Sequence, residues 1–75
     1  MGELFTMKFA DFKGDEWKIT EGLPVILECL KDSSMIEIID IDDKIYKMTL
    51  QQGGKIFIDR IEGKYRCYWN DDDLI

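Results

Sequence analysis

The sequence predicts a small α+β domain with an N-terminal β-hairpin, one short helix and a four-stranded antiparallel meander. Strand-like runs separated by turn-forming residues fill residues 36–70, which predicts the meander. An apolar stripe with helical spacing lies in residues 23–31, which predicts the helix. A chain of 75 residues has room for one core. We therefore place a single globular domain at residues 1–70 and an acidic C-terminal tail at residues 71–75.

The first predicted element is a hairpin over residues 5–20. Met7 and Phe9 alternate with polar neighbours, as in a strand that buries one face. A Gly-Asp pair in the middle suits a two-residue loop with glycine first. That loop would place Asp11 opposite Lys18, and opposite charges that meet across two strands stabilise a hairpin.

The next stretch, LPVILECLKD, admits two interpretations. As a helix it forms one apolar stripe, made of Leu23, Ile26, Leu27 and Leu30. As a strand that turns directly into the next strand, it would set Glu28 opposite Glu37, and a like-charge pair costs stability. We therefore expect the helix. In the alternative, residues 24–31 form a strand of an all-β small barrel, with an architecture like that of Sm or SH3 barrels.

The last hairpin of the meander carries the most specific register. The pair Glu62–Gly63 suits a two-residue loop. This loop would place Asp59 opposite Arg66, which makes an ion pair across the strands. It would also place Phe57 opposite Tyr68. One opposite-charge pair and one aromatic pair, on consistent faces, favour this register.

Two three-residue loops, at residues 42–44 and 52–54, complete the predicted meander. The first would pair Ile36 with Leu50, and the second would pair Leu50 with Ile56. These registers place a set of apolar side chains on one face of the meander. We expect this face to pack against the helix and form the core. The residues of this face are Ile36, Ile38, Tyr46, Met48, Leu50, Ile56, Ile58, Tyr65, Cys67 and Trp69.

Charge and composition argue against several classes of function. The net charge of −6 makes the chain a poor candidate for non-specific nucleic-acid binding. The chain has no histidine and two widely separated cysteines, so we expect no enzyme activity, catalytic residue, metal site or cofactor. Its start lacks the basic leader and long apolar core of an export signal, and no apolar run reaches the ~20 residues of a membrane span. We expect a cytoplasmic protein with reduced thiols and no membrane contact.

The opposite face of the meander is too apolar for a face that only meets water. We expect a small acidic protein–protein interaction domain, either a homodimer or an inhibitor or adaptor of a basic or nucleic-acid-binding partner. The candidate interaction face consists of Ile39, Ile41, Ile45, Lys47, Thr49, Phe57 and Tyr68.

Two other interpretations of this face stay open. In one, the N-terminal hairpin covers the face and there is no partner. In the other, the basic and aromatic residues of the stretch 44–70 form a sheet surface that binds nucleic acid. Against the second stands Asp59, which in the predicted register lies between Lys47 and Arg66 and neutralises that row.

Overall fold

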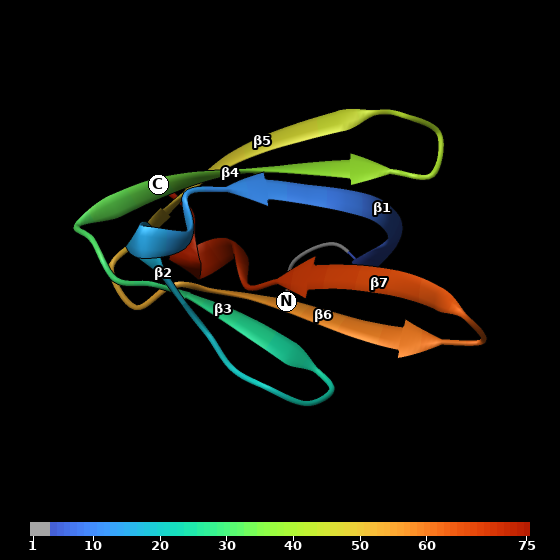
Figure 1. Ribbon diagram of the computed structural model, residues 1–75. Coiled ribbons are helices and arrows are strands. Elements are labelled where there is room, and N and C mark those ends of the chain that lie inside the picture. Colours follow the sequence, from blue (N-terminus) through green and yellow to red (C-terminus); the bar gives the residue numbers. More distant parts are fainter. Residues whose placement is uncertain (1–3) are drawn as a thin grey trace.

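The structure is one antiparallel sheet of seven strands that bends over on itself (Figure 1). It is a computed structural model that describes residues 4–75, with side chains from Thr6 onward. The strands are β1 (Leu4–Phe12), β2 (Trp17–Ile19), β3 (Val25–Cys29), β4 (Ser33–Asp40), β5 (Ile45–Gln51), β6 (Lys55–Ile61) and β7 (Lys64–Trp69). Two short 3-10 helices are η1 (Gly14–Glu16) and η2 (Asp71–Asp73). Within the described range, no helix is long and apolar enough to cross a membrane.

Strand β1 joins the two halves of the sheet. The strand order is β2-β3-β6-β7-β1-β4-β5, with β2 and β5 at the edges. The first part of β1, residues 4–7, pairs with β7, and the second part, residues 7–12, pairs with β4. In Figure 1, β1, β4 and β5 form one layer, and β3, β6 and β7 form the layer facing it. Sharing one long strand between two partners lets the twisted sheet curl around a core.

The core lies between these two layers. The apolar face predicted for the meander is confirmed as its main part, except that Tyr65 is 47% exposed. The predicted cover is different, because strands of the same sheet take the place of a helix. The buried residues that these strands contribute are Met7, Trp17, Leu27 and Cys29.

The predicted helix at residues 23–31 is wrong, and with it the α+β class. Residues Val25–Cys29 form β3, which pairs with β2 on one side and β6 on the other. Glu28 lies opposite Lys18 and Lys55, so the like-charge pair that argued against a strand does not arise. The all-β alternative has the right strand here, but the sheet is open at β2 and β5 instead of closing into a barrel. Pairing on both sides overrides a short helical pattern.

The predicted N-terminal hairpin is also wrong. Strands β1 and β2 do not pair with each other, because η1 turns the chain away and β2 pairs with β3. Phe12 and Trp17 still meet, edge to face with ring centroids 6.2 Å apart. This contact packs two rings together and needs no backbone ladder between their strands. Asp11 consequently lies opposite Glu37 of β4 instead of Lys18.

The hairpin of β6 and β7 is confirmed in its register. Asp59 pairs with Arg66 and Phe57 with Tyr68, as the loop at Glu62–Gly63 predicts. Both loop residues have positive φ, 52° and 77°, which matches the twist of a two-residue hairpin turn.

The hairpin of β4 and β5 has the predicted faces but a ladder shifted by two residues. Ile36 pairs with Met48 instead of Leu50. The cause is a longer loop, in which the Asp40 carboxylate accepts hydrogen bonds from the backbone N–H groups of Asp42 and Lys44, each 2.9 Å long. A shift of two residues leaves every side chain on its original face.

Strands β5 and β6 do not pair, so the predicted meander is broken at residues 52–54. The place beside β6 is taken by β3. The turn that follows β5 bonds to the end of β3 instead: the N–H of Gly53 donates to the carbonyl of Cys29, and the N–H of Cys29 donates to the carbonyl of Gly54, at 2.9 and 2.8 Å. A glycine-rich loop is compatible with a hairpin but does not enforce one.

The last residues of the chain lie against β5. Leu74 forms a bridge with Leu50, and the N–H of Ile75 donates to the carbonyl of Thr49 at 2.9 Å. Asp73 accepts a hydrogen bond from the N–H of Lys55 at 3.2 Å. The domain boundary at residue 70 stays a prediction, while these contacts give residues 71–75 a position over part of the β5 edge.

Candidate protein-interaction face

The outer face of β1, β4 and β5, which points away from the core, carries a row of apolar side chains. Phe9 is paired with Ile39, and Ile39 with Ile45, across three adjacent strands. Phe9 is 55% exposed and Ile45 is 54% exposed, with Ile39 half-buried between them. We call these three residues the apolar row. Large apolar side chains that adjoin on a surface are typical of contact sites.

A β-bulge in β1 turns Phe9 to the outer face. Met7 pairs with Asp40 and Phe9 with Ile39, so Lys8 is one extra residue in β1. Strict alternation would put Phe9 in the core beside Met7. In the structure Met7 is buried, but Phe9 is exposed. The extra residue Lys8 points out and its Nζ lies 2.8 Å from Asp43 Oδ1, a hydrogen bond that raises the pKa of Lys8. Bulges commonly re-aim a side chain at a functional surface.

A charged row lies beside the apolar row, two residues further along the strands. It runs from Asp11 through Glu37 to Lys47. Lys47 Nζ lies 3.6 Å from the Glu37 carboxylate. On its other side Glu37 faces Asp11, and within residues 4–75 the Asp11 side chain has no ion-pair or hydrogen-bond partner. We call Asp11 and Glu37 the acidic pair.

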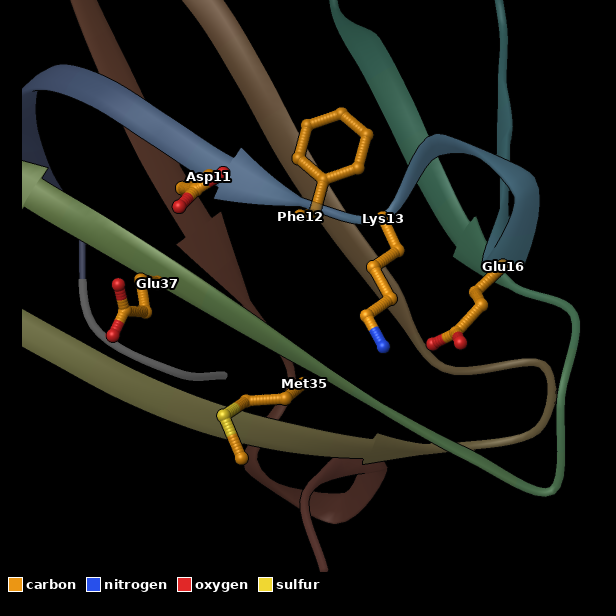
Figure 2. Close-up of a pocket in the computed structure, with 6 residues that line it drawn as sticks. All are labelled: Asp11, Phe12, Lys13, Glu16, Met35 and Glu37. Atoms are coloured by element: carbon orange, nitrogen blue, oxygen red, sulfur yellow. The ribbon is translucent and has the colours of Figure 1, made fainter.

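A hollow of about 330 Å³ opens at the acidic pair, near the end of β1, where β4 continues with β5 as its neighbour (Figure 2). Its lining residues are Asp11, Phe12, Lys13, Glu16, Met35 and Glu37. Figure 2 shows Asp11 and Glu37 on neighbouring strands at one end, and Lys13 pointing into the end that holds Glu16. The Glu16 carboxylate accepts a hydrogen bond from Ser34 Oγ at 2.7 Å. The hollow therefore combines apolar walls with more negative than positive charge.

The outer face of β6 and β7 has a different character. Arg66 donates two hydrogen bonds to the Asp59 carboxylate, both 3.1 Å long, and this contact raises the pKa of Arg66. Beside it, Phe57 and Tyr68 stack with ring centroids 5.1 Å apart and planes 7° from parallel. A second hollow, of about 360 Å³, is lined by Phe57, Tyr68, Trp69 and Asn70. On this face Asp59 and Arg66 are paired with each other, and the rings of Phe57 and Tyr68 cover each other.

The predicted site residues fall into two groups. The residues of the first group lie together on β4 and β5 or in the turn between them: Ile39, Ile41, Ile45, Lys47 and Thr49. Phe57 and Tyr68 lie on β6 and β7, and β1 separates them from the first group. Phe9 and the acidic pair could not be found from the sequence, because a bulge and the pairing of β1 with β4 have no local sequence signal.

The nucleic-acid interpretation needs Lys47 and Arg66 on one surface, and the fold separates them. Lys47 is on β5 and Arg66 on β7, with β1 and β4 between them. Each cation also faces an acid, Glu37 for Lys47 and Asp59 for Arg66. A phosphate would have to compete with these carboxylates.

Comparisons of this chain with protein-family models, with curated proteins and with solved structures found no significant match. Among the described residues there is also no group of three or more acidic or cysteine side chains that could hold a metal ion. The geometry of the faces is therefore the basis for the proposed function.

Proposed function

We propose that this chain is a small acidic protein-interaction domain that binds its partner through the outer face of β1, β4 and β5. The observation that carries the proposal is the apolar row, in which the bulge at Lys8 turns Phe9 out of the core and beside Ile39 and Ile45. A thin core in a chain of this size gains from every buried aromatic ring. An aromatic ring turned outward therefore favours a contact role for that face.

The charge of the chain indicates the kind of partner. A net charge of −6 repels other acidic molecules and attracts basic ones. A domain of this kind would serve as an inhibitor or adaptor of a basic or nucleic-acid-binding protein. Its two free, buried thiols suit a reducing compartment, and we place it in the cytoplasm.

The test is selection of short random peptides, displayed on phage, against the immobilised protein. Ile45→Ser removes one side chain from the apolar row, and Ile61→Ser is the matched control, because Ile61 is 46% exposed at the end of β6. We expect enriched peptides that bind the wild type and Ile61→Ser alike and bind Ile45→Ser about tenfold or more weakly. Peptides that bind all three proteins equally, or no enrichment at all, would contradict the proposed face.

A second candidate function, single-stranded nucleic-acid binding, is favoured only by the stacked pair Phe57 and Tyr68 beside a hollow. Its test is fluorescence anisotropy with labelled single-stranded DNA and RNA at low salt. If it holds, Phe57→Ala and Tyr68→Ala each weaken binding, and raising the salt concentration weakens it further. Absence of binding to the wild type at low salt would remove this candidate.

A further inference from the structure

We propose that the partner of this face is an extended protein segment with a lysine or arginine two residues from an apolar residue, and that the acidic pair receives the cation. This inference rests on the proposed function and names the chemistry of the partner. The apolar residue would contact the row of Phe9, Ile39 and Ile45. The basic side chain would enter the hollow at Asp11 and Glu37.

The acidic pair has an electrostatic cost in the free protein. Asp11 and Glu37 are direct neighbours across an antiparallel ladder, where like charges are destabilising. Lys47 compensates Glu37 from one side only, at 3.6 Å, and the Asp11 carboxylate has no such partner within the described chain. A cation placed between the two carboxylates would relieve this repulsion and make charge-assisted hydrogen bonds.

The shape of the site suits a long basic side chain. The hollow has a volume of about 330 Å³, and its walls include Phe12 and Met35. Lysine and arginine carry long apolar stems that pack on such walls while their charged ends reach polar groups. Lys13 points into the end of the hollow that holds Glu16 (Figure 2). Lys47 contacts only Glu37 of the acidic pair, so Asp11 has no ion-pair partner within the described chain.

The spacing of the apolar row and the acidic pair matches the repeat of an extended segment. Asp11 lies two residues from Phe9 on β1, and Glu37 lies two residues from Ile39 on β4. Two residues along a strand correspond to about 7 Å, and both residues lie on the same face. A bound strand repeats the same distance between its residues i and i+2. An extended segment with the pattern apolar–x–basic would therefore match the apolar row and the acidic pair at once.

A second copy of this chain fits the site less well than a basic partner. Two copies with a net charge of −6 each repel one another, and each would bring its own acidic pair to the contact. A basic segment gains from the same field, which also speeds its association at low salt.

The experiment uses peptides selected on the wild-type protein and compares three single variants. Asp11→Asn and Glu37→Gln each remove one charge of the acidic pair and keep the shape of the side chain. Asp15→Asn is the matched control, because it removes one exposed charge from η1, outside the hollow. A second set of the same peptides carries citrulline in place of arginine and acetyl-lysine in place of lysine, which removes the charge.

We expect the selected peptides to share a lysine or arginine close to an apolar residue. Asp11→Asn and Glu37→Gln should each raise Kd about tenfold, as should the uncharged peptides, while Asp15→Asn changes Kd much less. Thermal unfolding adds a readout that a structural role would not give: Asp11→Asn should raise Tm while it weakens binding, because it removes the repulsion from Glu37.

Four outcomes would overturn the inference. In the first, the peptides depend on Ile45 but lack basic residues. In the second, they bind Asp11→Asn as tightly as Asp15→Asn. Either outcome would leave the proposed function standing and show that the acidic pair takes no part in binding. Peptides that do not depend on Ile45 would remove both. A dimer seen by sedimentation velocity that Ile45→Ser converts to a monomer would show that a second copy occupies the face.

Discussion

The two outer faces of this sheet carry the same kinds of residue, acids and aromatic rings, but differ in how these residues are paired. On β6 and β7, the acid Asp59 meets Arg66, with two hydrogen bonds of 3.1 Å. On β1 and β4, the acid Asp11 meets the acid Glu37. On the first face Phe57 stacks on Tyr68, whereas on the second Phe9 is turned outward by a bulge and is 55% exposed.

The difference separates residues that serve folding from residues that serve contact. On the β6–β7 face, Asp59 pairs with Arg66 and Phe57 with Tyr68, so stability alone accounts for both pairs. The β1–β4–β5 face contains a repulsive pair and exposed apolar side chains. Substitutions that favour stability alone would remove both features. Departures of this kind concentrate at functional surfaces.

The largest expected effect comes from comparing the two sides of β4 and β5. Ile38 is fully buried on the inner side, and Ile45 is 54% exposed on the outer side. We expect Ile38→Ala to lower the free energy of unfolding by roughly 2–5 kcal/mol, because it leaves a cavity in the core. Ile45→Ala should lower it by less than about 1 kcal/mol. Urea denaturation followed by tryptophan fluorescence measures both, and equal losses would mean that Ile45 also serves the core.

The pKa of the Cys67 thiol reports how tightly the β6–β7 half is packed around it. Burial raises the pKa of Cys67 from its ordinary value of 9.0 to about 12, so the folded state binds this proton more tightly than the unfolded state. Stability is then unaffected by this group below pH 9 and falls between pH 9 and 12, by up to roughly 1.4 kcal/mol per pH unit.

The alkaline loss of stability should be smaller in Cys67→Ala than in the wild type. The measurement is the urea midpoint between pH 8 and pH 10.5, and each protein is compared with its own value at pH 8. A loss of the same size in both proteins would show that other groups cause it and that the thiol titrates in the folded state as it does in water.

A smaller effect is expected where the end of the chain meets β5. Leu74 packs against the core and bridges to Leu50, whereas the side chain of Ile75 is 74% exposed. Leu74→Ala should therefore cost about 1–2 kcal/mol of unfolding free energy. Ile75→Ala is the control and should be nearly neutral, because its backbone N–H still donates to Thr49. If Leu74→Ala is also neutral, residues 71–75 do not support the β1–β4–β5 half.

The same comparison shows which parts of the fold the sequence could predict. The β6–β7 register follows from a two-residue turn at Glu62–Gly63, and such a turn fixes the pairing of the strands that it joins. The inner and outer faces of β4 and β5 follow from alternation, which a ladder shift of two residues leaves intact. Local chemistry was sufficient for the β6–β7 register and for the faces of β4 and β5, but not for the ladder between β4 and β5.

The parts that failed depend on contacts between distant segments. The stretch around Ile26 and Leu27 has helical spacing over a few residues only, and pairing with β2 and β6 makes it a strand. The split of β1 between β7 and β4 decides that Asp11 meets Glu37, and the bulge at Lys8 decides that Phe9 faces outward. None of these is encoded within a short window, so the candidate site could not be assembled from the sequence.

The most direct test of the contrast between the two faces is thermal unfolding of two matched variants, Asp11→Asn and Asp59→Asn. Each replaces one carboxylate with an amide of the same shape on an outer strand face. Asp11→Asn should raise Tm, since like charges across strands cost roughly 0.2–1 kcal/mol, and the gain should shrink in high salt. Asp59→Asn should lower Tm, because it weakens the paired contact with Arg66. A lower Tm for Asp11→Asn would contradict the account, since it would show that Asp11 serves folding as Asp59 does.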